Sequence, residues 1–330
     1  MNFPTIKYCP GTLAEGFETY SRTCLNRVFQ GKKVNHVLPY YSPTYNSETD
    51  ELFDENRKCI SISGVQEKFS LLLDKNKFRL VNYGEYGTHI LKSIPSGVKK
   101  SDQMPENEHL TMQIAHQVYG IETAENALIF FKNGPPAYIT KRFDVKEDGT
   151  KLAQDDFASL AGRTPQTHGE NYKYLGNYFE IFQLMQKYLP VYKLEAPKLL
   201  KILIFNYLFS NGDAHFKNFS LLETPMGDYR LSPAYDLLNS RIHIEDKDFA
   251  LEEGLLPKEL SKGNIAKQFS TLADQAGINK KMFNDILTLM LMKSDLVEKL
   301  LTASFLNEST KRNYWQSYKG RLKQLMKSAN

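Results

Sequence analysis

The sequence has few cysteines and no long apolar run, and each absence excludes a class of protein. Three cysteines among 330 residues are too few, and odd in number, for a disulfide framework. No stretch approaches the roughly 18–20 consecutive apolar residues that a transmembrane helix needs. The opening residues 1–4 do not read as a signal peptide. We therefore expect a cytoplasmic protein that does not cross a membrane.

Signatures of metal and nucleotide binding are also sparse. No C-x-x-C pair occurs, so a zinc site would have to combine Cys9, Cys24 and His36 with a fourth ligand. The sequence has no G-x-G-x-x-G motif, although a turn at Gly64 would let backbone N–H groups approach a phosphate. Ordinary packed thiols and an ordinary turn remain the alternatives at these positions.

A strong excess of charge is absent as well. The 42 basic and 38 acidic side chains leave a net charge of +4, which does not by itself indicate a nucleic-acid partner. Only residues 308–327 are biased, with six Lys or Arg side chains and a single acid, Glu308. This segment predicts either a solvated helix face or a phosphate-binding stripe, and the sequence leaves both open.

The chemistry that is present concentrates in one stretch. Residues 211–218 read Asn-Gly-Asp-Ala-His-Phe-Lys-Asn and follow an apolar run over 199–209 that predicts a buried helix. Asp213 can orient or deprotonate a hydroxyl, while Asn218 and the later Asp236 can hold magnesium ions that bridge nucleotide phosphates. This order is that of the protein-kinase catalytic loop. A polar turn with capping side chains is the alternative.

The segment between Asn218 and Asp236 supports a shared metal site. Residues 219–222 and 229–231 read as two short strands, with a turn over 224–228. A hairpin brings its two ends together, because paired strands lie about 4.8 Å apart. We therefore expect Asn218 and Asp236 to reach the same magnesium ion.

A second charged group is expected in the first half of the chain. Lys92 lies in an apolar strand, and a buried ammonium needs an acidic partner. The predicted helix over 105–120 offers Glu106 and Glu108. A Lys on a strand paired with a Glu on the next helix is how kinases position the α- and β-phosphates. A solvated Lys on an edge strand is the alternative.

The remaining elements follow from apolar periodicity. The expected strands are 60–63, 68–73, 78–81, 89–94, 127–131 and 137–143. The further helices are 178–189, 265–276, 281–292 and 311–327.

These elements divide the chain into three parts. Residues 1–58 read as an irregular N-terminal segment, with a helix within 12–30 and a mobile acidic loop over 42–56. Residues 59–144 form a strand-rich N-lobe with the nucleotide loop, and residues 145–330 form a helical C-lobe with the catalytic loop. The predicted fold class is α+β, a two-lobed protein-kinase-like fold with nucleotide in the cleft.

Together these motifs resemble the HipA family of bacterial serine/threonine kinases, the toxins of toxin–antitoxin modules. The resemblance runs from about Ser61 to the C-terminus. Its motifs are residues 61–68, 90–92, 107–108, 141–144, 154–156, 211–220 and 235–236. The Ser-Ile-Ser sequence at 61–63 is similar to that of the shorter HipT-type toxins.

The resemblance implies ATP and Mg²⁺ as cofactors and assigns roles to individual residues. Asp213 would be the catalytic base, Lys92 a phosphate ligand supported by Glu108, and Asn218 and Asp236 the magnesium ligands. The other implied nucleotide-binding residues are Ser63, Gly64, Val65, Gln66, Glu67, Lys68, Lys141, Arg142, Phe143, Gln154, His215, Lys217 and Tyr235. Residues 141–143 would hold adenine through their backbone, and Gln154 would reach the ribose.

The resemblance also implies partners and regulation. Family members phosphorylate aminoacyl-tRNA synthetases and pair with a helix-turn-helix antitoxin, through which operator DNA is mainly contacted. They autophosphorylate on a serine equivalent to Ser61 or Ser63. A phosphoserine adds about −1.5 to −2 charges at neutral pH, so we expect it to repel ATP and lower activity.

Two departures from the family pattern stand out. Longer members carry a further N-terminal subdomain, whereas only about sixty residues precede Ser61 here. A separate small protein would replace that subdomain, or it is missing. Lys141 stands where a Glu is common, which leaves its side-chain contact with adenine open.

Two other functions compete with a protein kinase. A small-molecule phosphotransferase of the aminoglycoside-kinase type would use a similar arrangement of Asp213, His215 and Asn218, but Ser61 and Ser63 in the nucleotide loop argue against it. A catalytically silent module that only sequesters an antitoxin is the other alternative. The intact set of Lys92, Asp213, Asn218 and Asp236 argues against a loss of catalysis.

Overall fold

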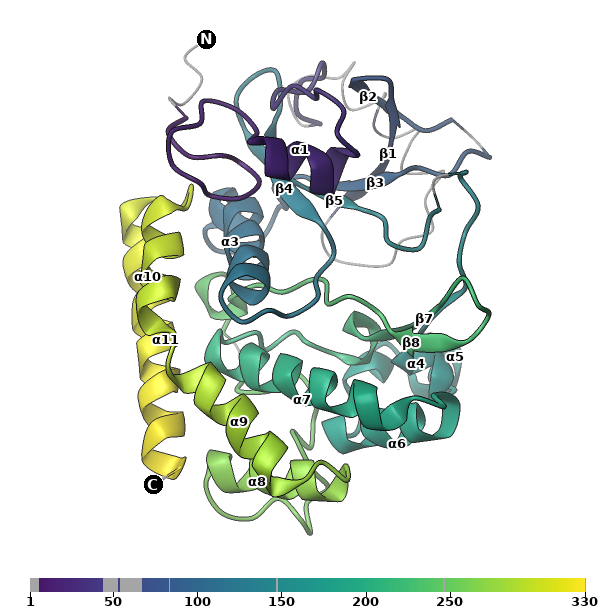
Figure 1. Ribbon diagram of the computed structural model, residues 1–330, viewed down its shortest axis with the longest axis vertical. Helices are drawn as coiled ribbons and strands as arrows, with labels where there is room; N and C mark the ends of the chain where they lie inside the picture. The colour runs from purple at the N-terminus through teal and green to yellow at the C-terminus, as the bar shows by residue number, and fades with distance from the viewer. Residues whose placement is uncertain are drawn as a thin grey trace. The chain divides into compact units, whose positions relative to one another are not determined.

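The computed structural model describes residues 6–43, 53, 67–82, 84–146, 148–245 and 247–329. The chain forms two compact units that interleave in sequence (Figure 1). The first, strand-rich unit comprises Met1–Gln113, Ala124–Thr150 and Lys299–Lys311. The second, mainly helical unit comprises Ile114–Thr123, Lys151–Glu298 and Arg312–Asn330.

The first unit is built on a five-stranded antiparallel sheet in the order β2-β1-β3-β5-β4. Its strands are β1 (Lys68–Asp74), β2 (Lys77–Leu80), β3 (His89–Lys92), β4 (Asn126–Phe130) and β5 (Pro136–Lys141). Tight hairpins join β1 to β2 and β4 to β5. At the second of these turns Gly134 has a φ of 106°, a backbone conformation that favours glycine.

Helix α1 (Arg22–Phe29) packs against β4 and β5 and completes the apolar core of this unit. The helix predicted within 12–30 is shorter than that range. It begins at Arg22 because the Ser21 side chain caps it, accepting from the Cys24 N–H. The preceding residues form turns instead, with the Cys9 N–H donating to the Ala14 carbonyl at 2.8 Å.

A short 3₁₀ turn, η1 (Ser101–Gln103), leads into helix α3 (Met104–Gln117). The predicted helix starts within one residue of this position, at Pro105. Proline fits there because the N–H groups of a first helical turn have no intrahelical partner. The helix carries Glu106 and Glu108 in its first half.

The second unit contains most of the helices and a small sheet. Its sheet has the order β6-β7-β8, with β6 (Gln154–Asp156), β7 (Ser220–Glu223) and β8 (Tyr229–Leu231). The helices are α4 (Phe157–Leu160), α5 (Pro165–His168), α6 (Tyr178–Tyr188), α7 (Tyr192–Leu208), α8 (Ile265–Gln275), α9 (Lys280–Leu291), α10 (Ser294–Ala303) and α11 (Glu308–Ala329). The last two have part of their length in the first unit. Short 3₁₀ turns lie at η2 (Tyr172–Tyr174), η3 (Phe216–Asn218) and η4 (Ser240–Ile242).

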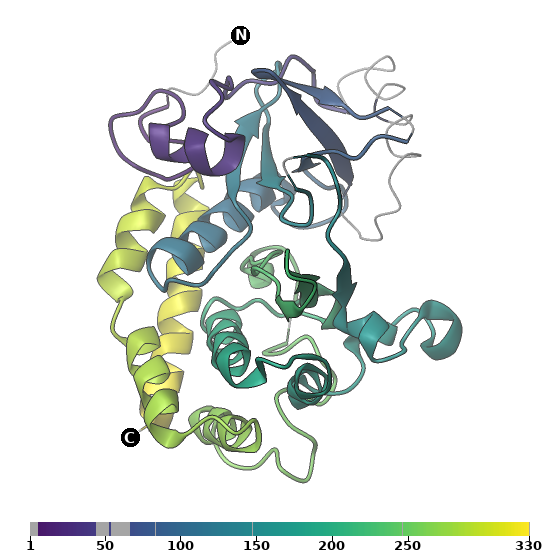
Figure 2. The same cartoon turned by 45° about the vertical axis from the view of Figure 1, so that its right-hand side comes forward.

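Helix α7 is the centre of this unit. Helices α6 and α9 pack against it, and α8 packs against α9 (Figure 2). Nearly every residue from Leu199 to Leu208 is buried, as expected from the apolar run. The helix nevertheless begins earlier than predicted, at Tyr192, and includes Pro197. Its buried C-terminal half fixes the position of the loop that follows.

The sequence missed the elements whose patterns are short or polar. Strand β6 has only three residues, all polar, and therefore lacks the alternation that identifies a strand. Helix α10 follows α9 after two residues, and the sequence analysis predicted the helix over 281–292 but not α10. In the described part of the chain, no helix combines the length and the apolar character needed to cross a membrane.

Candidate active site

The loop after α7 has a defined backbone that presents its polar side chains. Ser210 has a φ of 52°, which reverses the chain directly after the helix. The Asn211 N–H donates to the Asn206 carbonyl at 2.8 Å, and the Gly212 N–H donates to Ser240 Oγ at 2.9 Å. Asp213 therefore follows a turn held from both sides.

The Asp213 carboxylate accepts a hydrogen bond from a tyrosine that sequence reasoning missed. Tyr174 donates its hydroxyl to Asp213 Oδ1 at 2.8 Å, and its ring meets the His215 ring edge-on at 5.2 Å. The backbone of Tyr174 is fixed, since its carbonyl accepts from the Glu252 N–H at 3.0 Å. Asp213 stays partly exposed, so its carboxylate remains accessible to a substrate hydroxyl.

His215 is held in its neutral form. Burial, followed by the positive charge of Lys173, lowers the pKa of His215 to about 3. Its backbone N–H donates to Asn218 Oδ1 at 3.1 Å, and the Asn218 N–H donates back to the His215 carbonyl at 2.9 Å. His215 therefore shapes the turn that carries Asn218 and does not act as an acid at neutral pH.

The predicted approach of Asn218 to Asp236 is confirmed. Strands β7 and β8 form the expected hairpin, and Asn218 Nδ2 donates to Asp236 Oδ2 at 3.2 Å. Asp236 has a φ of 56°, and its carbonyl accepts from Asn211 Nδ2 at 3.4 Å. Left-handed backbone at a non-glycine residue is uncommon, and it turns this carboxylate toward Asn218.

These two side chains fit a magnesium ion that arrives with a nucleotide. Among the described residues, no three His, Cys, Asp or Glu side chains form a group able to hold a metal, and Cys9 and Cys24 are free, buried thiols. The zinc alternative therefore has no support in this part of the chain. Mg²⁺ is commonly held by one or two side-chain oxygens together with phosphates. Asp236 offers a carboxylate and Asn218 an amide oxygen. Because Asn218 Oδ1 already accepts from the His215 N–H, it would hold the ion with its second lone pair.

Gln154 and Tyr235 lie together beside this group. Both donate to Ser220 Oγ, Gln154 from Nε2 at 2.9 Å and Tyr235 from its hydroxyl at 3.2 Å. The Tyr235 hydroxyl also lies 2.9 Å from the Lys217 carbonyl and can donate to it instead. Burial raises the pKa of Tyr235, which therefore stays a hydrogen-bond donor. Gln154 itself is exposed, as a ribose contact requires.

In the first unit, the predicted ion pair is confirmed. Lys92 Nζ lies 2.6 Å from Glu108 Oε1, and both side chains are buried. The ammonium also lies 5.3 Å from the centre of the Tyr138 ring. The other acid, Glu106, is buried as well, and burial raises its pKa to about 8. Glu108 is therefore the acid that balances Lys92.

The other predicted nucleotide-binding residues of this unit occupy strand ends. Lys68 opens β1 directly opposite Lys92, and Glu67 precedes it. Lys141 closes β5, and the Arg142 N–H donates to the Thr88 carbonyl at 2.9 Å.

The segment after β5 continues with a local ion pair. Arg142 Nε donates to Asp144 Oδ1 at 2.9 Å, and Phe143 between them is half-buried. The predicted residues Ser61, Ser63, Gly64, Val65 and Gln66 lie outside the described residues.

Both the sequence and the fold of this chain are similar to those of known proteins. The family model described as HipA-like C-terminal domain matches residues 60–296. A putative kinase of Haemophilus influenzae is 24% identical over 327 residues, which cover 93% of this chain and 92% of that protein. The serine/threonine-protein kinase toxin HipA of Shewanella oneidensis is 25% identical over 256 residues, which cover 72% of this chain and 56% of that protein.

A solved structure of the Shewanella oneidensis toxin–antitoxin system, with HipA, HipB and operator DNA, has the same fold. Its HipA chain superposes with a TM-score of 0.61 at 21% identity, covering 82% of this chain and 64% of that one. The predicted fold class, α+β and kinase-like with a strand-rich and a helical lobe, is therefore confirmed.

Proposed function

Because the chain belongs to the HipA-like C-terminal domain family, we propose that it is an ATP-dependent serine/threonine protein kinase that inhibits growth. The observation that carries this proposal is the group in the second unit. There a partly exposed carboxylate, Asp213, lies in the same loop as Asn218, whose amide is hydrogen-bonded to the Asp236 carboxylate, and this amide–carboxylate pair suits Mg²⁺. This is the set of groups that phosphoryl transfer to a hydroxyl requires.

Each residue has a defined task in this proposal. Asp213 orients the acceptor hydroxyl and takes its proton, and Tyr174 holds the carboxylate in place through Oδ1. Asn218 and Asp236 hold Mg²⁺, which when bound neutralises charge on the phosphates. Lys92, kept in position by Glu108, contacts the nucleotide phosphates.

The first test is transfer of labelled phosphate from ATP to proteins of a cell lysate, with identification of the labelled bands. We expect wild-type protein to label one or a few proteins and Asp213→Asn to label them about 10²-fold more slowly or less. Asp228→Asn, which changes an exposed carboxylate in the turn of the β7–β8 hairpin, is the matched control. Equal rates for Asp213→Asn and wild type would remove the assignment of Asp213.

The same experiment addresses the substrate class. We propose a translation protein such as an aminoacyl-tRNA synthetase as the acceptor, following the family resemblance. Label that appears only in small molecules would instead support a phosphotransferase of the aminoglycoside-kinase type. Label in neither fraction would support a silent binding module.

We further propose a helix-turn-helix antitoxin as partner, with operator DNA contacted mainly through it. The support is the Shewanella oneidensis complex of HipA with HipB and operator DNA. A separate small protein that resembles the N-terminal subdomain of longer family members is a second expected partner. Co-purification from cells that express the neighbouring genes tests both, and a chain that purifies alone would contradict them.

Autophosphorylation on Ser61 or Ser63 completes the proposal. Intact-mass measurement of wild type and Asp213→Asn tests it, with added phosphate expected only in the wild type. The aspartate variants Ser61→Asp and Ser63→Asp should bind ATP more weakly, since negative charge repels its phosphates. Unchanged ATP affinity and activity in both would contradict a regulatory role.

A further inference from the structure

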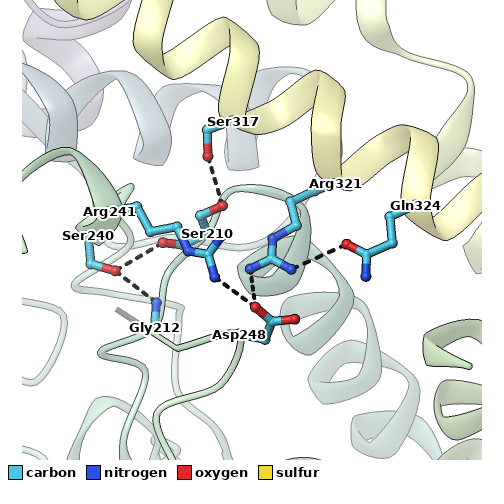
Figure 3. A network of polar contacts seen from close by, with 8 residues as sticks. All are labelled: Ser210, Gly212, Ser240, Arg241, Asp248, Ser317, Arg321 and Gln324. Atoms are coloured by element: carbon cyan, nitrogen blue, oxygen red, sulfur yellow. Dashed lines mark hydrogen bonds and ion pairs between the residues drawn. The ribbon is translucent and has the colours of Figure 1, made fainter. Parts of the chain in front are cut away.

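Helix α11 is joined to the loop of Asp213 by a network of polar contacts in the second unit (Figure 3). Figure 3 shows Ser317 and Arg321 projecting from α11 toward Ser210 and Asp248, with Gln324 of the same helix joined to Arg321. None of these α11 residues belongs to the proposed active site.

The first connection runs through hydroxyl groups. Ser317 Oγ and Ser210 Oγ are hydrogen-bonded at 2.9 Å. The Ser210 carbonyl accepts from Ser240 Oγ at 2.9 Å, and Ser240 Oγ accepts from the Gly212 N–H at 2.9 Å. Ser210 is left-handed, a conformation that a serine keeps only where its surroundings impose it. These bonds impose it at the turn directly before Asp213.

The second connection runs through a shared carboxylate. Asp248 Oδ1 accepts from Arg321 Nη2 at 2.5 Å and from Arg241 Nη2 at 2.7 Å. Arg321 is only 5% exposed, and its guanidinium stacks 4.7 Å from the centre of the Tyr207 ring on α7. The buried guanidinium is held on two sides, and Asp248, whose side chain is 47% exposed, joins it to the 36% exposed Arg241.

Both connections meet in the turn η4. Ser240 belongs to the first connection and Arg241 to the second, and they are consecutive residues. This turn follows Asp236 by only four residues, and Asp236 is the second left-handed residue of the loop region. Helix α11 therefore holds the turn before Asp213 and the segment after Asp236 at the same time.

We propose that Ser317 and Arg321 are positioning residues that keep Asp213, Asn218 and Asp236 in the geometry needed for magnesium-dependent phosphoryl transfer. The consequence for activity rests on the proposed kinase function. The magnesium concentration that activity requires is then set in part by α11, a helix whose side chains do not reach Asn218 or Asp236. A purely structural role for α11 would lower stability without changing the magnesium requirement.

The experiment compares Arg321→Gln, Asp248→Asn and Ser317→Ala with Lys323→Gln, a control that removes an exposed charge from the same helix. Mg²⁺ is titrated at fixed ATP in binding and phosphorylation assays. We expect Arg321→Gln to raise the half-saturating Mg²⁺ concentration about tenfold, the equivalent of one hydrogen bond to a charged group. Ser317→Ala should have a smaller effect and Lys323→Gln none. Arg321→Lys, which keeps the charge but not the planar fork, should restore part of the loss.

Hydrogen exchange separates this inference from the proposed function. The Gly212 and Ser240 amides should exchange faster in Arg321→Gln and Ser317→Ala than in Lys323→Gln, whether or not the protein is a kinase. Unchanged exchange at both amides would overturn the inference. If the wild-type protein is active, an unchanged magnesium requirement in Arg321→Gln and Ser317→Ala would also overturn the inference, even if the Tm of these variants is lower. If the variants show the exchange difference but the wild-type protein binds no Mg²⁺–ATP, the kinase proposal alone is overturned.

Discussion

The Lys92–Glu108 ion pair and the group of Asp213, Asn218 and Asp236 are built in opposite ways. Lys92 and Glu108 sit on a regular strand and a regular helix, bury both charges and neutralise each other at 2.6 Å. Asp213 and Asp236 sit on irregular backbone, and Asn218 ends the 3₁₀ turn η3. All three stay partly exposed, and Asp236 is left-handed. The first arrangement fixes a charge in place, and the second keeps its polar side chains partly exposed, as the binding of a ligand requires.

This difference predicts different consequences of mutation. A buried ion pair that loses one partner leaves an uncompensated charge in an apolar region, which costs stability. A partly exposed carboxylate that loses its charge leaves no such penalty. Variants of the first group should therefore lose folding stability together with activity, and variants of the second group should lose activity alone.

The largest expected effect on stability is that of Glu108→Ala. Removing the carboxylate leaves Lys92 buried without its acid, which should cost about 3–5 kcal/mol in the free energy of unfolding. Urea titration followed by circular dichroism measures this change. Glu85→Ala, in an ion pair on the surface of the same unit, is the control and should have little effect. Equal losses of unfolding free energy in Glu108→Ala and Glu85→Ala would contradict the expected difference between the buried and the exposed ion pair.

The next largest effect is expected for Asp236→Ala. Loss of one of two side-chain ligands should weaken magnesium-dependent ATP binding about 100-fold, while the unfolding free energy changes little. Calorimetry with and without Mg²⁺ measures the binding. Magnesium–ATP affinity equal to that of wild type would show that Asp236 is only structural.

Tyr174→Phe sharpens the comparison within the second unit. It removes one hydrogen bond to the Asp213 carboxylate while keeping the ring against His215. A bond to a charged group contributes about 1.5 kcal/mol, so kcat should fall about tenfold with the KM for ATP unchanged. Tyr172→Phe, two residues earlier, is the control. A change in KM with constant kcat would place Tyr174 in nucleotide binding instead.

The smallest expected effect is a loss of stability at mildly acidic pH, which buried histidines in both units cause. The pKa of His215 is about 3, and those of His89 and His109 in the first unit are about 4, below the ordinary value of 6.5. Because the unfolded chain binds protons more readily, stability should fall as the pH drops from about 6.5 toward these values. Each histidine contributes about 0.7 kcal/mol of this loss between pH 7 and pH 6.

Unfolding titrations at neutral and mildly acidic pH measure the loss. His215→Gln should reduce the pH dependence, and His168→Gln, which changes an exposed side chain, should not. An identical pH dependence in both variants would contradict the burial argument.

Contacts could be predicted from the sequence where short connections join the interacting residues. Asp213 and Asn218 share one loop, and Asp236 is brought to them by a hairpin whose strands are visible in the sequence. The Lys92–Glu108 pair joins a strand to the next helix, which is also a local relation. These contacts could be predicted because short connections leave few possible geometries.

Contacts between distant segments could not be predicted in this way. Tyr174 lies 39 residues before Asp213 in an irregular segment, and nothing in its neighbours indicates that it faces the loop. Ser317 lies 107 residues after Ser210, and in the sequence it belongs to a basic helix that could as well be a solvated face. Such partners are set by how distant segments pack together, which the periodicity of one helix does not reveal.

The β7–β8 hairpin also has a consequence for how this chain can vary. Asn218 and Asp236 lie at its open end, whereas its turn lies at the opposite end, where Met226 is 92% exposed. Insertions at this turn lengthen the hairpin away from both side chains, so related chains can differ in length there without a loss of the site. For the same reason, a short peptide tag or a fluorescent label placed at Met226 would report on the protein while leaving Asn218 and Asp236 undisturbed.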